Sequence, residues 1–348
     1  MALLLIEGFE GYASAINTTI STYMARRGWV STNSGGSQVG LMPGRIAGYA
    51  LTDYYNAGSY NSTWTYSNLP TTANTLILGV AFYQNTAAIT STFNLYDGAT
   101  LGVNVSVVAS TGVITVKTGA TTLTTYTAAT LINTWYYLEI KVLCDSSVGT
   151  VEVRLNGVSI ISLTGQNTKA GTHSYHNGFS INASAQFSTQ RFDDIYVCDN
   201  SGSTQNNFLG VCQVIGLLPT ADAVAGQWTT STGSTHYNLV NERLEDDDTT
   251  YVYSSTTAQQ DYYTFTQLLG TGPILGLQIN TTCRISSGTS AILETPVSSN
   301  SVVAIGADTT VSSTTYTDVC TINLLDPNTN AAWTVAGLNA AMFGLKIM

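Results

Sequence analysis

The sequence predicts an all-β protein of two domains, on three observations. Nearly every segment alternates apolar and polar residues with the period of a β-strand. These segments are short, rich in β-branched and aromatic residues, and separated by turn signals such as Asp97-Gly98. Helical periodicity is confined to two short stretches, 14–29 and 331–343.

The N-terminus, MALLLIEGFEGY, predicts a first strand. Its apolar run of about five residues is interrupted by Glu7 and has no basic segment before it. A secretion signal needs an apolar core of about 7–15 residues, and a membrane span needs about 20. We therefore expect a soluble protein that is made in the cytoplasm without a signal peptide.

From residue 75 onward the chain is divided into short strand-like segments. In TVEVRLNGV, Val151 and Val153 can face one side of a sheet while Glu152 and Arg154 face the other. The Asn-Gly dipeptide at 156–157 favours the positive φ angles of a two-residue hairpin turn. Strands with this spacing predict an antiparallel sandwich or jelly roll, with segments at 75–84, 91–98, 101–110, 112–119, 135–145 and 150–165.

A change in composition predicts where the two domains meet. The stretch DNSGSTQNNF, residues 199–208, has the polar, glycine-bearing character of a linker. The next stretch, FLGVCQVIGLLP at 208–219, predicts the first strand of a second and smaller β domain, and 343–348 predicts its last strand. We therefore expect domains at 1–207 and 208–348.

The charge content is unusually low. Charged residues make up 9% of the chain and the net charge is −10, whereas a typical soluble domain has roughly 25% charged residues. Nucleic-acid binding requires a basic surface, so we expect no nucleic-acid partner. A surface with few charges loses little hydration free energy when another subunit covers it, which favours a component of an assembly.

Several segments, taken in order, carry a family resemblance. They are LLLIEGFEGY, PGRIAGYAL (43–51), WYYLEIKV (135–142), GTVEVRLNGV (149–158) and FDDIYVCDNSG (192–202). Their order resembles a laminin-G/concanavalin-like jelly-roll domain of the kind found in virion proteins of tailed bacteriophages. The second half, from NNFLGVCQVIG to the ending AAWTVAGLNAAMFGLKIM, is similar to the companion domain of those proteins.

The resemblance implies a non-enzymatic structural protein on the outer surface of the phage particle. We expect a capsid decoration protein, with a tail accessory protein as the alternative placement, because the chain has no fibrous, repeat-rich shaft. The expected partners are copies of itself, for example in a homotrimer, and other virion proteins such as the major capsid protein. The resemblance implies no catalytic residues and no cofactor, and we expect no membrane partner.

The adjacent aspartates Asp193 and Asp194 are the first candidate site. In the laminin-G-like pattern their segment is the last strand of the sandwich, with Ile195 and Val197 alternating into the core. The carboxylates would then accept N–H bonds from a turn at the start of the strand. A calcium role and a catalytic role are the alternatives to this structural prediction.

A carbohydrate-binding adhesin is the alternative function. Aromatic residues gather in DYYNAGSYNSTWTYSN, where Trp64 and Tyr66 share one face of a predicted strand. These two rings could stack on a sugar. Tyrosine and tryptophan in a polar segment also suit a protein interface or a core.

A glycosidase or depolymerase is the third hypothesis. A retaining glycosidase needs two carboxylates about 5 Å apart. The strand segments offer Glu139 alone, Glu152 alone, and Asp193 with Asp194, which point to opposite faces of a regular strand. We therefore expect no enzyme and no catalytic residues.

The remaining reactive residues fit no motif. The acidic run NERLEDDD (241–248) favours a solvated turn over a cation site, since its spacing differs from that of a calcium-binding loop. His173, His176 and His236 accompany no nucleophile motif. The cysteines have no metal-ligand spacing, so we expect free thiols, or disulfides formed later in an oxidising medium; they are Cys144, Cys198, Cys212, Cys283 and Cys320.

Overall fold

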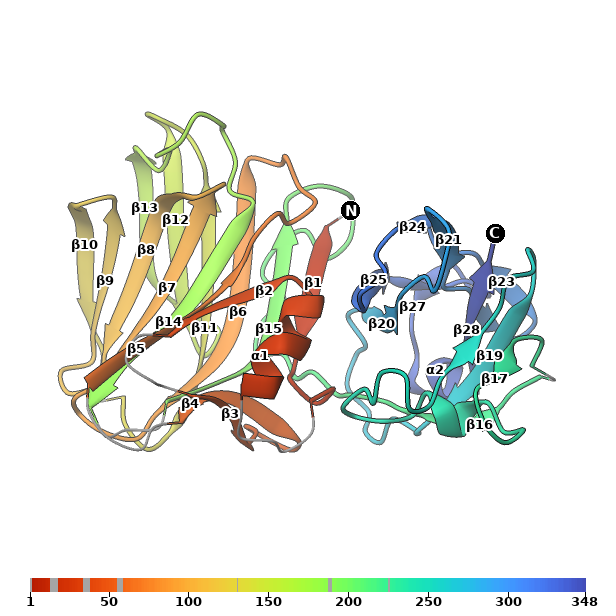
Figure 1. Ribbon diagram of the computed structural model, residues 1–348. Helices are drawn as coiled ribbons and strands as arrows, with labels where there is room; N and C mark the ends of the chain where they lie inside the picture. The colour runs from red at the N-terminus through yellow and green to blue at the C-terminus, as the bar shows by residue number, and fades with distance from the viewer. Residues whose placement is uncertain are drawn as a thin grey trace. The chain divides into compact units, whose positions relative to one another are not determined.

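The computed structural model divides the chain into two compact units, Met1–Val214 and Ile215–Met348 (Figure 1). The described residues are 2–12, 18–33, 38–54, 59–129, 131–186, 190–224 and 226–348. Strands dominate both units, so the predicted all-β class is confirmed. Among the described residues, no helix has both the length and the apolar character that crossing a membrane requires.

The first unit is a sandwich of two antiparallel sheets. Sheet A has the order β13-β12-β11-β6-β15-β4-β3, with β1 paired to β15, and sheet B has the order β10-β9-β8-β7-β14-β5-β2. Sheet A contains β1 (Leu3–Glu7), β3 (Gln38–Pro43), β4 (Tyr49–Tyr54), β6 (Thr75–Gln84), β11 (Trp135–Leu143), β12 (Gly149–Leu155), β13 (Val158–Gln166) and β15 (Gln190–Asp199). Sheet B contains β2 (Trp29–Asn33), β5 (Ser59–Tyr66), β7 (Thr90–Asp97), β8 (Thr100–Val108), β9 (Val113–Thr118), β10 (Thr121–Thr127) and β14 (Gly178–Gln186).

The core of the sandwich lies between the two sheets and is rich in aromatic rings. Phe93 of sheet B packs against Phe82 and Phe192 of sheet A, with ring centroids 5.7 and 5.9 Å apart. Burying one such side chain stabilises the fold by about 1.5–3 kcal/mol. Helix α1 (Thr18–Arg26) adds Ile20 and Met24 to this core.

The hairpin between β12 and β13 forms where the sequence predicts it. Asn156 and Gly157 have φ angles of 51° and 79°, which a two-residue turn of the primed type requires. Leu155 and Val158 close the hairpin as a pair. The local sequence therefore sets the register of this edge of sheet A.

The second unit has one larger sheet and three two-stranded ribbons. The sheet contains β16 (Pro219–Asp222), β19 (Gln260–Phe265), β21 (Ala291–Glu294), β22 (Val297–Ser299), β23 (Val302–Ala304), β24 (Thr309–Val311) and β28 (Met342–Ile347). The ribbons pair β17 (Thr229–Thr230) with β18 (Val252–Tyr253), β20 (Leu277–Cys283) with β25 (Thr317–Asn323), and β26 (Leu325–Asp326) with β27 (Ala331–Ala332). A short 3₁₀ helix, η1 (Tyr237–Leu239), and helix α2 (Val335–Ala340) complete the unit.

The junction of the two units differs from the sequence prediction. The first unit extends to Val214, whereas we expected it to end at 207. The predicted strand at 208–219 does not form, and regular structure resumes only with β16 at Pro219. The reason is that several main-chain N–H groups of this segment bond to side chains of the first unit, as described below.

Candidate functional site

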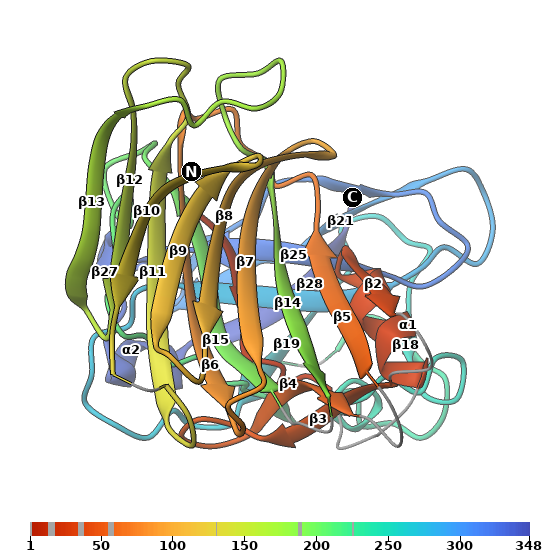
Figure 2. The same ribbon diagram turned by 90° about the vertical axis from the view of Figure 1, so that its left-hand side faces the viewer.

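The outer face of sheet B, whose strands lie toward the viewer in Figure 2, carries two neighbouring rows of uncharged polar side chains, which we call the polar face. Alternate residues of the same strands, such as Phe93 and Ile181, belong to the core, so these rows point away from it. The strand register aligns the first row as Asn104, Asn94, Ser180 and Thr65, and the second as Ser106, Thr92, Asn182 and Thr63. At the β9 end, Lys117 pairs with Asn104 and Thr115 pairs with Ser106.

Side-chain hydrogen bonds hold the first row of the polar face in place. Asn104 donates from Nδ2 to Asn94 Oδ1 across 2.7 Å, and Asn94 donates from Nδ2 to Ser180 Oγ across 2.9 Å. The hydroxyl of Tyr96 lies 3.1 Å from the same Ser180 Oγ. In the second row, Asn182 Nδ2 lies 2.5 Å from Thr63 Oγ1. Each amide can form more hydrogen bonds than it uses here, so the face retains donors and acceptors in fixed positions.

Trp64 and Tyr66, whose alternative role was a sugar-stacking platform, lie on the other side of sheet B. Trp64 is fully buried, with its ring centroid 6.0 Å from that of Phe192. Tyr66 stacks on Phe179 with centroids 6.0 Å apart. Trp64 and Tyr66 do share one face of β5, but it is the core face, so the buried Trp64 ring cannot stack on a sugar. Trp64 is a core residue, in agreement with the expectation of an interface or a core for this segment.

Asp193 and Asp194 are buried and both form hydrogen bonds with Arg45. Asp193 Oδ2 accepts the main-chain N–H of Arg45 across 2.7 Å, and Asp194 Oδ2 accepts Nε of Arg45 across 2.6 Å. Asp194 Oδ1 also accepts the N–H of Val214 across 2.7 Å. In this arrangement the two carboxylates hold two loops against sheet A, while Ile195 and Val197 lie in the core as expected.

A β-bulge explains why both aspartates reach the same arginine. The register between β15 and β6 shifts after Asp193, and Asp194 has a φ angle of 51°. A regular strand would send adjacent side chains to opposite faces. The expectation of opposite faces is therefore wrong at this point, because the bulge re-aims one of the two side chains.

Burial raises the pKa of both aspartates and of the nearby Glu10. Burial, aided by the charge of Asp194, raises the pKa of Asp193 to about 7. Burial also raises the pKa of Asp194. Nearby Glu10 has its pKa raised to about 9, chiefly by burial and then by the charge of Asp193.

Residues 207–214, which we call the linker strap, lie along the outer face of sheet A. Glu139, which is fully buried, accepts the N–H of Gly210 across 2.8 Å and the hydroxyl of Tyr196 across 2.5 Å. Tyr196 in turn accepts the N–H of Leu209. The guanidinium of Arg154 lies 4.0 Å from the centre of the Phe208 ring, a cation–π contact. Glu139 thus serves as an anchor for the strap.

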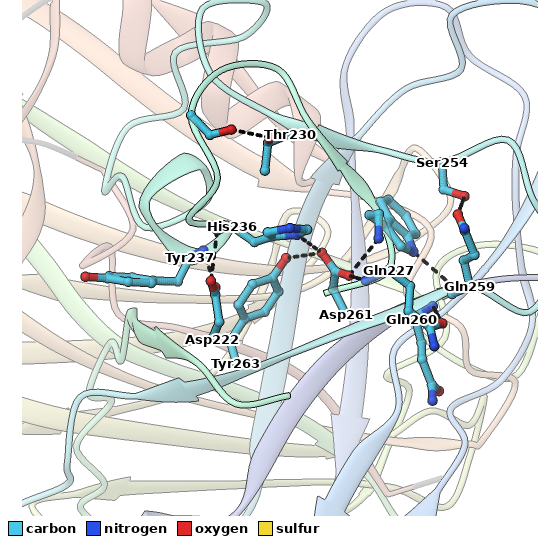
Figure 3. A network of polar contacts seen from close by, with 12 residues as sticks. Asp222, Gln227, Thr230, His236, Tyr237, Ser254, Gln259, Gln260, Asp261 and Tyr263 are labelled. Atoms are coloured by element: carbon cyan, nitrogen blue, oxygen red, sulfur yellow. Dashed lines mark hydrogen bonds and ion pairs between the residues drawn. The ribbon is translucent and has the colours of Figure 1, made fainter. Parts of the chain in front are cut away.

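A network of polar contacts in the second unit is centred on Asp261 (Figure 3). Asp261 is 1% exposed and accepts the main-chain N–H groups of Gln227 and Trp228 at its Oδ1, across 2.7 and 2.9 Å. Its Oδ2 lies 2.6 Å from Nδ1 of His236 and accepts the hydroxyl of Tyr263. Asp222 accepts the N–H groups of His236 and Tyr237. No sequence motif marks Asp261, because most of its partners are distant along the chain.

The acidic run forms a turn, as the sequence predicts. Asp246 accepts the N–H and the hydroxyl of Thr250 across 3.0 and 2.8 Å. Asp248 pairs with Arg284 across 2.7 Å and accepts the hydroxyl of Tyr316. Within the described residues, no group of three or more His, Cys, Asp or Glu side chains could hold a metal ion.

The other histidines and the cysteines lie in contrasting surroundings. His173 is exposed and its Nδ1 lies 2.6 Å from Asp97 Oδ1. His176 is 1% exposed, and this burial lowers its pKa to about 4. Cys144 and Cys198 are buried, and all five cysteines are free thiols.

Comparisons with known proteins identify distant structural neighbours of the sandwich. No family model matches the chain, and no curated protein matches it. An endo-β-1,4-glucuronan lyase from the fungus Trichoderma reesei has 13% identity and a TM-score of 0.40, covering 49% of this chain and 91% of its own. A protein of unknown function with a galectin-like fold from Bacillus subtilis has 10% identity and a TM-score of 0.37, covering 56% and 98%. The carbohydrate-binding module CBM66 from Bacillus subtilis has 11% identity and a TM-score of 0.32, covering 54% and 99%.

The chain is all-β, and its first unit is a sandwich of two antiparallel sheets, as predicted. None of the three neighbours is described as a virion protein.

Proposed function

We propose that the sandwich unit is a non-catalytic carbohydrate-binding module that holds a neutral glycan on the polar face of sheet B. The observation that carries the proposal is the pair of aligned rows of amide and hydroxyl side chains on the outer face of sheet B. Asn94 and Ser180 are buried among their neighbours, and the other members of the two rows are half-buried. This is the adhesin hypothesis of the sequence analysis, with its binding surface moved from Trp64 and Tyr66 to the polar face.

The chemistry of the polar face matches that of a sugar. Each sugar hydroxyl is both a donor and an acceptor, and asparagine amides and hydroxyl side chains supply both functions. The two rows carry no charged side chain, and Lys117 lies beside Asn104 at their β9 end, so a neutral ligand covers the rows without burying unpaired charges. Tyr96, two residues beyond Asn94 on β7, adds an aromatic ring whose hydroxyl lies beside Ser180.

The pre-ordering of the polar face favours affinity. Binding costs about 0.5–1.5 kcal/mol for each flexible side chain that must become ordered. Here Asn104, Asn94 and Ser180 already hold one another through hydrogen bonds of 2.7 and 2.9 Å. A ligand would therefore meet groups that are ordered before it arrives.

The carboxylates of sheet A support a binding role over a catalytic one. Glu139 and Asp194 each accept a main-chain N–H of the linker strap, and Asp193 accepts that of Arg45. These bonds give the carboxylates a structural task. A general acid or nucleophile of a glycosidase must instead reach a glycosidic bond.

The proposal is tested by binding to neutral polysaccharides. Xylan, galactomannan and hydroxyethylcellulose would be titrated into the full chain, and a variant with Asn94→Ala and Asn182→Ala would be compared with the wild type. The matched control is Asn167→Ala, at an exposed asparagine in the loop after β13. We expect the wild type and the control to bind at least one polysaccharide, and the double variant to lose about tenfold or more in affinity. An equal affinity for a variant that retains its thermal stability, or no binding of any of the three by the wild type, would contradict the proposal.

The second candidate is the structural protein of a phage virion, as a capsid decoration or tail accessory protein on the particle surface. Its support is the apolar surface of the second unit, where Leu269 is 85% and Ile305 56% exposed. Exposed apolar side chains together with 9% charged residues suit burial against further copies or other virion proteins. Light scattering tests this role: a stable oligomer that binds expanded phage heads supports it, and a monomer without affinity for particles opposes it.

A further inference from the structure

The ribbon β17–β18 of the second unit presents two tyrosines on one face. Thr229 pairs with Tyr253 in this ribbon, and Ser231 and Tyr251 extend it, because Ser231 donates its N–H to Tyr251 O across 2.9 Å. Residues two apart on a strand share a face, and cross-strand partners share it too. Tyr251 and Tyr253 therefore stand beside the hydroxyl side chains of Thr229 and Ser231.

Both tyrosines of the pair are open to solvent. Tyr251 is 38% and Tyr253 50% exposed. Their centroids are 5.8 Å apart and their planes are tilted by 52°. Tyrosine combines an apolar ring with a polar tip, which is why it is enriched on binding surfaces. The pair thus forms an angled aromatic surface rimmed by hydroxyl groups.

The base of this ribbon is fixed by the Asp261 network (Figure 3). Asp261 accepts the N–H groups of Gln227 and Trp228, the residues that lead into β17. The indole N–H of Trp228 donates to Gln259 O across 3.1 Å. On the β18 side, Ser254 donates its hydroxyl to Gln259 Oε1 across 2.6 Å. Both strands of the ribbon are therefore anchored to the start of β19, which limits the ordering that a ligand would require.

We propose that Tyr251 and Tyr253, with Thr229 and Ser231, form a second carbohydrate-binding platform that takes a pyranose ring of a neutral glycan. One side of a pyranose ring is a layer of C–H bonds, which packs on an aromatic ring, while its rim carries hydroxyl groups that match those of Thr229 and Ser231. The charge distribution agrees with a neutral ligand. Asp248, which precedes the ribbon strand, is paired with Arg284 and Tyr316.

A second platform makes the chain bivalent for a polysaccharide. This inference extends the proposed function from one unit to both, but its residues are independent of the polar face. Two linked sites raise the apparent affinity for a long polymer by about 10²–10⁴-fold over a single site, provided that both can bind at once. Short oligosaccharides, by contrast, fill each platform separately.

The test compares binding stoichiometry and avidity in variants of the full chain. Hexasaccharides of xylose, mannose and glucose would be titrated by calorimetry, and the corresponding polysaccharides would be immobilised to measure avidity. The test variant carries Tyr251→Ala and Tyr253→Ala. The matched control is Tyr126→Ala, because Tyr126 of β10 is 37% exposed in the first unit. A variant with Tyr251→Phe and Tyr253→Phe keeps the rings and removes only the hydroxyls.

We expect the alanine variant to bind one hexasaccharide per chain where the wild type binds two, and to lose at least about tenfold in avidity. The Tyr126→Ala control and the phenylalanine variant should keep both properties. Unchanged stoichiometry in a folded alanine variant would overturn the proposal. So would a loss of self-association in place of sugar binding, since the pair would then be an interface between copies. If the Asn94→Ala and Asn182→Ala variant keeps its stoichiometry while the tyrosine variant loses one site, the polar face fails and this platform stands.

Discussion

Arg45 and Asp194 form a nearly buried ion pair, with Nε and Oδ2 2.6 Å apart and side-chain exposures of 14% and 3%. Asp194 also accepts the N–H of Val214, at the end of the linker strap. The same arginine donates from Nη2 to Cys212 O. One ion pair thus links the loop after β3, the bulge of β15 and the segment that leads to the second unit.

Removal of Arg45 should strongly destabilise the first unit. Arg45→Ala leaves Asp194 buried without its counter-charge, which typically costs about 3–5 kcal/mol. Urea unfolding, monitored by hydrogen exchange of amides in the first unit, measures this loss of stability. The control is Arg284→Ala, which breaks the solvent-exposed pair with Asp248 and should change stability little. If the two substitutions lowered the free energy of unfolding equally, the buried Arg45–Asp194 pair would contribute no more to stability than the exposed Arg284–Asp248 pair.

Raising the pH should destabilise the fold through Asp193 and Glu10. The folded-state pKa is raised to about 7 for Asp193 and to about 9 for Glu10. The folded state therefore binds more protons than the unfolded state between 3.8 and about 7 for the first group, and between 4.5 and about 9 for the second. Stability must fall as pH rises through these windows. Thermal unfolding of the wild type, Asp193→Asn and Glu10→Gln at a series of pH values measures the slope, which each substitution should reduce in its own window.

Lowering the pH should destabilise the fold through His176. Burial lowers its pKa to about 4 from an ordinary value of 6.5, so the folded state binds fewer protons than the unfolded state between these values. Stability contributed by the neutral ring is then lost as pH falls through this window. His176→Leu should remove that loss and be neutral or stabilising at neutral pH, because both ring nitrogens lack a hydrogen-bond partner among the described residues. A variant that stays as acid-sensitive as the wild type would show that another group is responsible.

Asp261→Asn should loosen the second unit and leave the first unchanged. The carboxylate accepts N–H groups at Oδ1, and at Oδ2 it accepts Tyr263 and contacts His236. The asparagine side-chain NH2 would face some of these donors in place of a carboxylate oxygen. Each donor left without an acceptor lowers the free energy of unfolding by about 1–3 kcal/mol. Hydrogen–deuterium exchange with mass spectrometry should show faster exchange around Gln227, Trp228 and β19. Unaltered protection there would mean that the network is not required for the ribbon.

Much of the fold could be predicted from the sequence, because strand alternation and turn residues are signals between neighbouring positions of the chain. The alternation of Val151 to Leu155 and the Asn156-Gly157 turn determine a hairpin without any distant partner. The strap could not be predicted in this way. Its apolar stretch has the composition of a strand, and only the positions of Glu139 and Asp194 in the folded sheet show that side chains accept its N–H groups.

The candidate site, too, could be predicted only in part from the sequence. The alternation of threonine with Trp64 and Tyr66 in β5 indicates two different faces, but the sequence does not say which one is inside. The polar face depends on register, since Asn104, Asn94 and Ser180 belong to three strands. Their individual positions were visible as polar residues in alternating strands, but their alignment required the folded sheet.

Nuclear magnetic resonance of the side-chain amides tests the central claim most directly. The full chain would be titrated with the hexasaccharide of the polysaccharide that binds best, and the Nδ2 signals of Asn94, Asn104 and Asn182 would be followed. We expect these signals to shift in a saturable manner while that of Asn167 stays in place. If Asn167 or residues of sheet A shift instead, or if the three amides stay unchanged at saturating ligand, the polar face is not the glycan-binding surface.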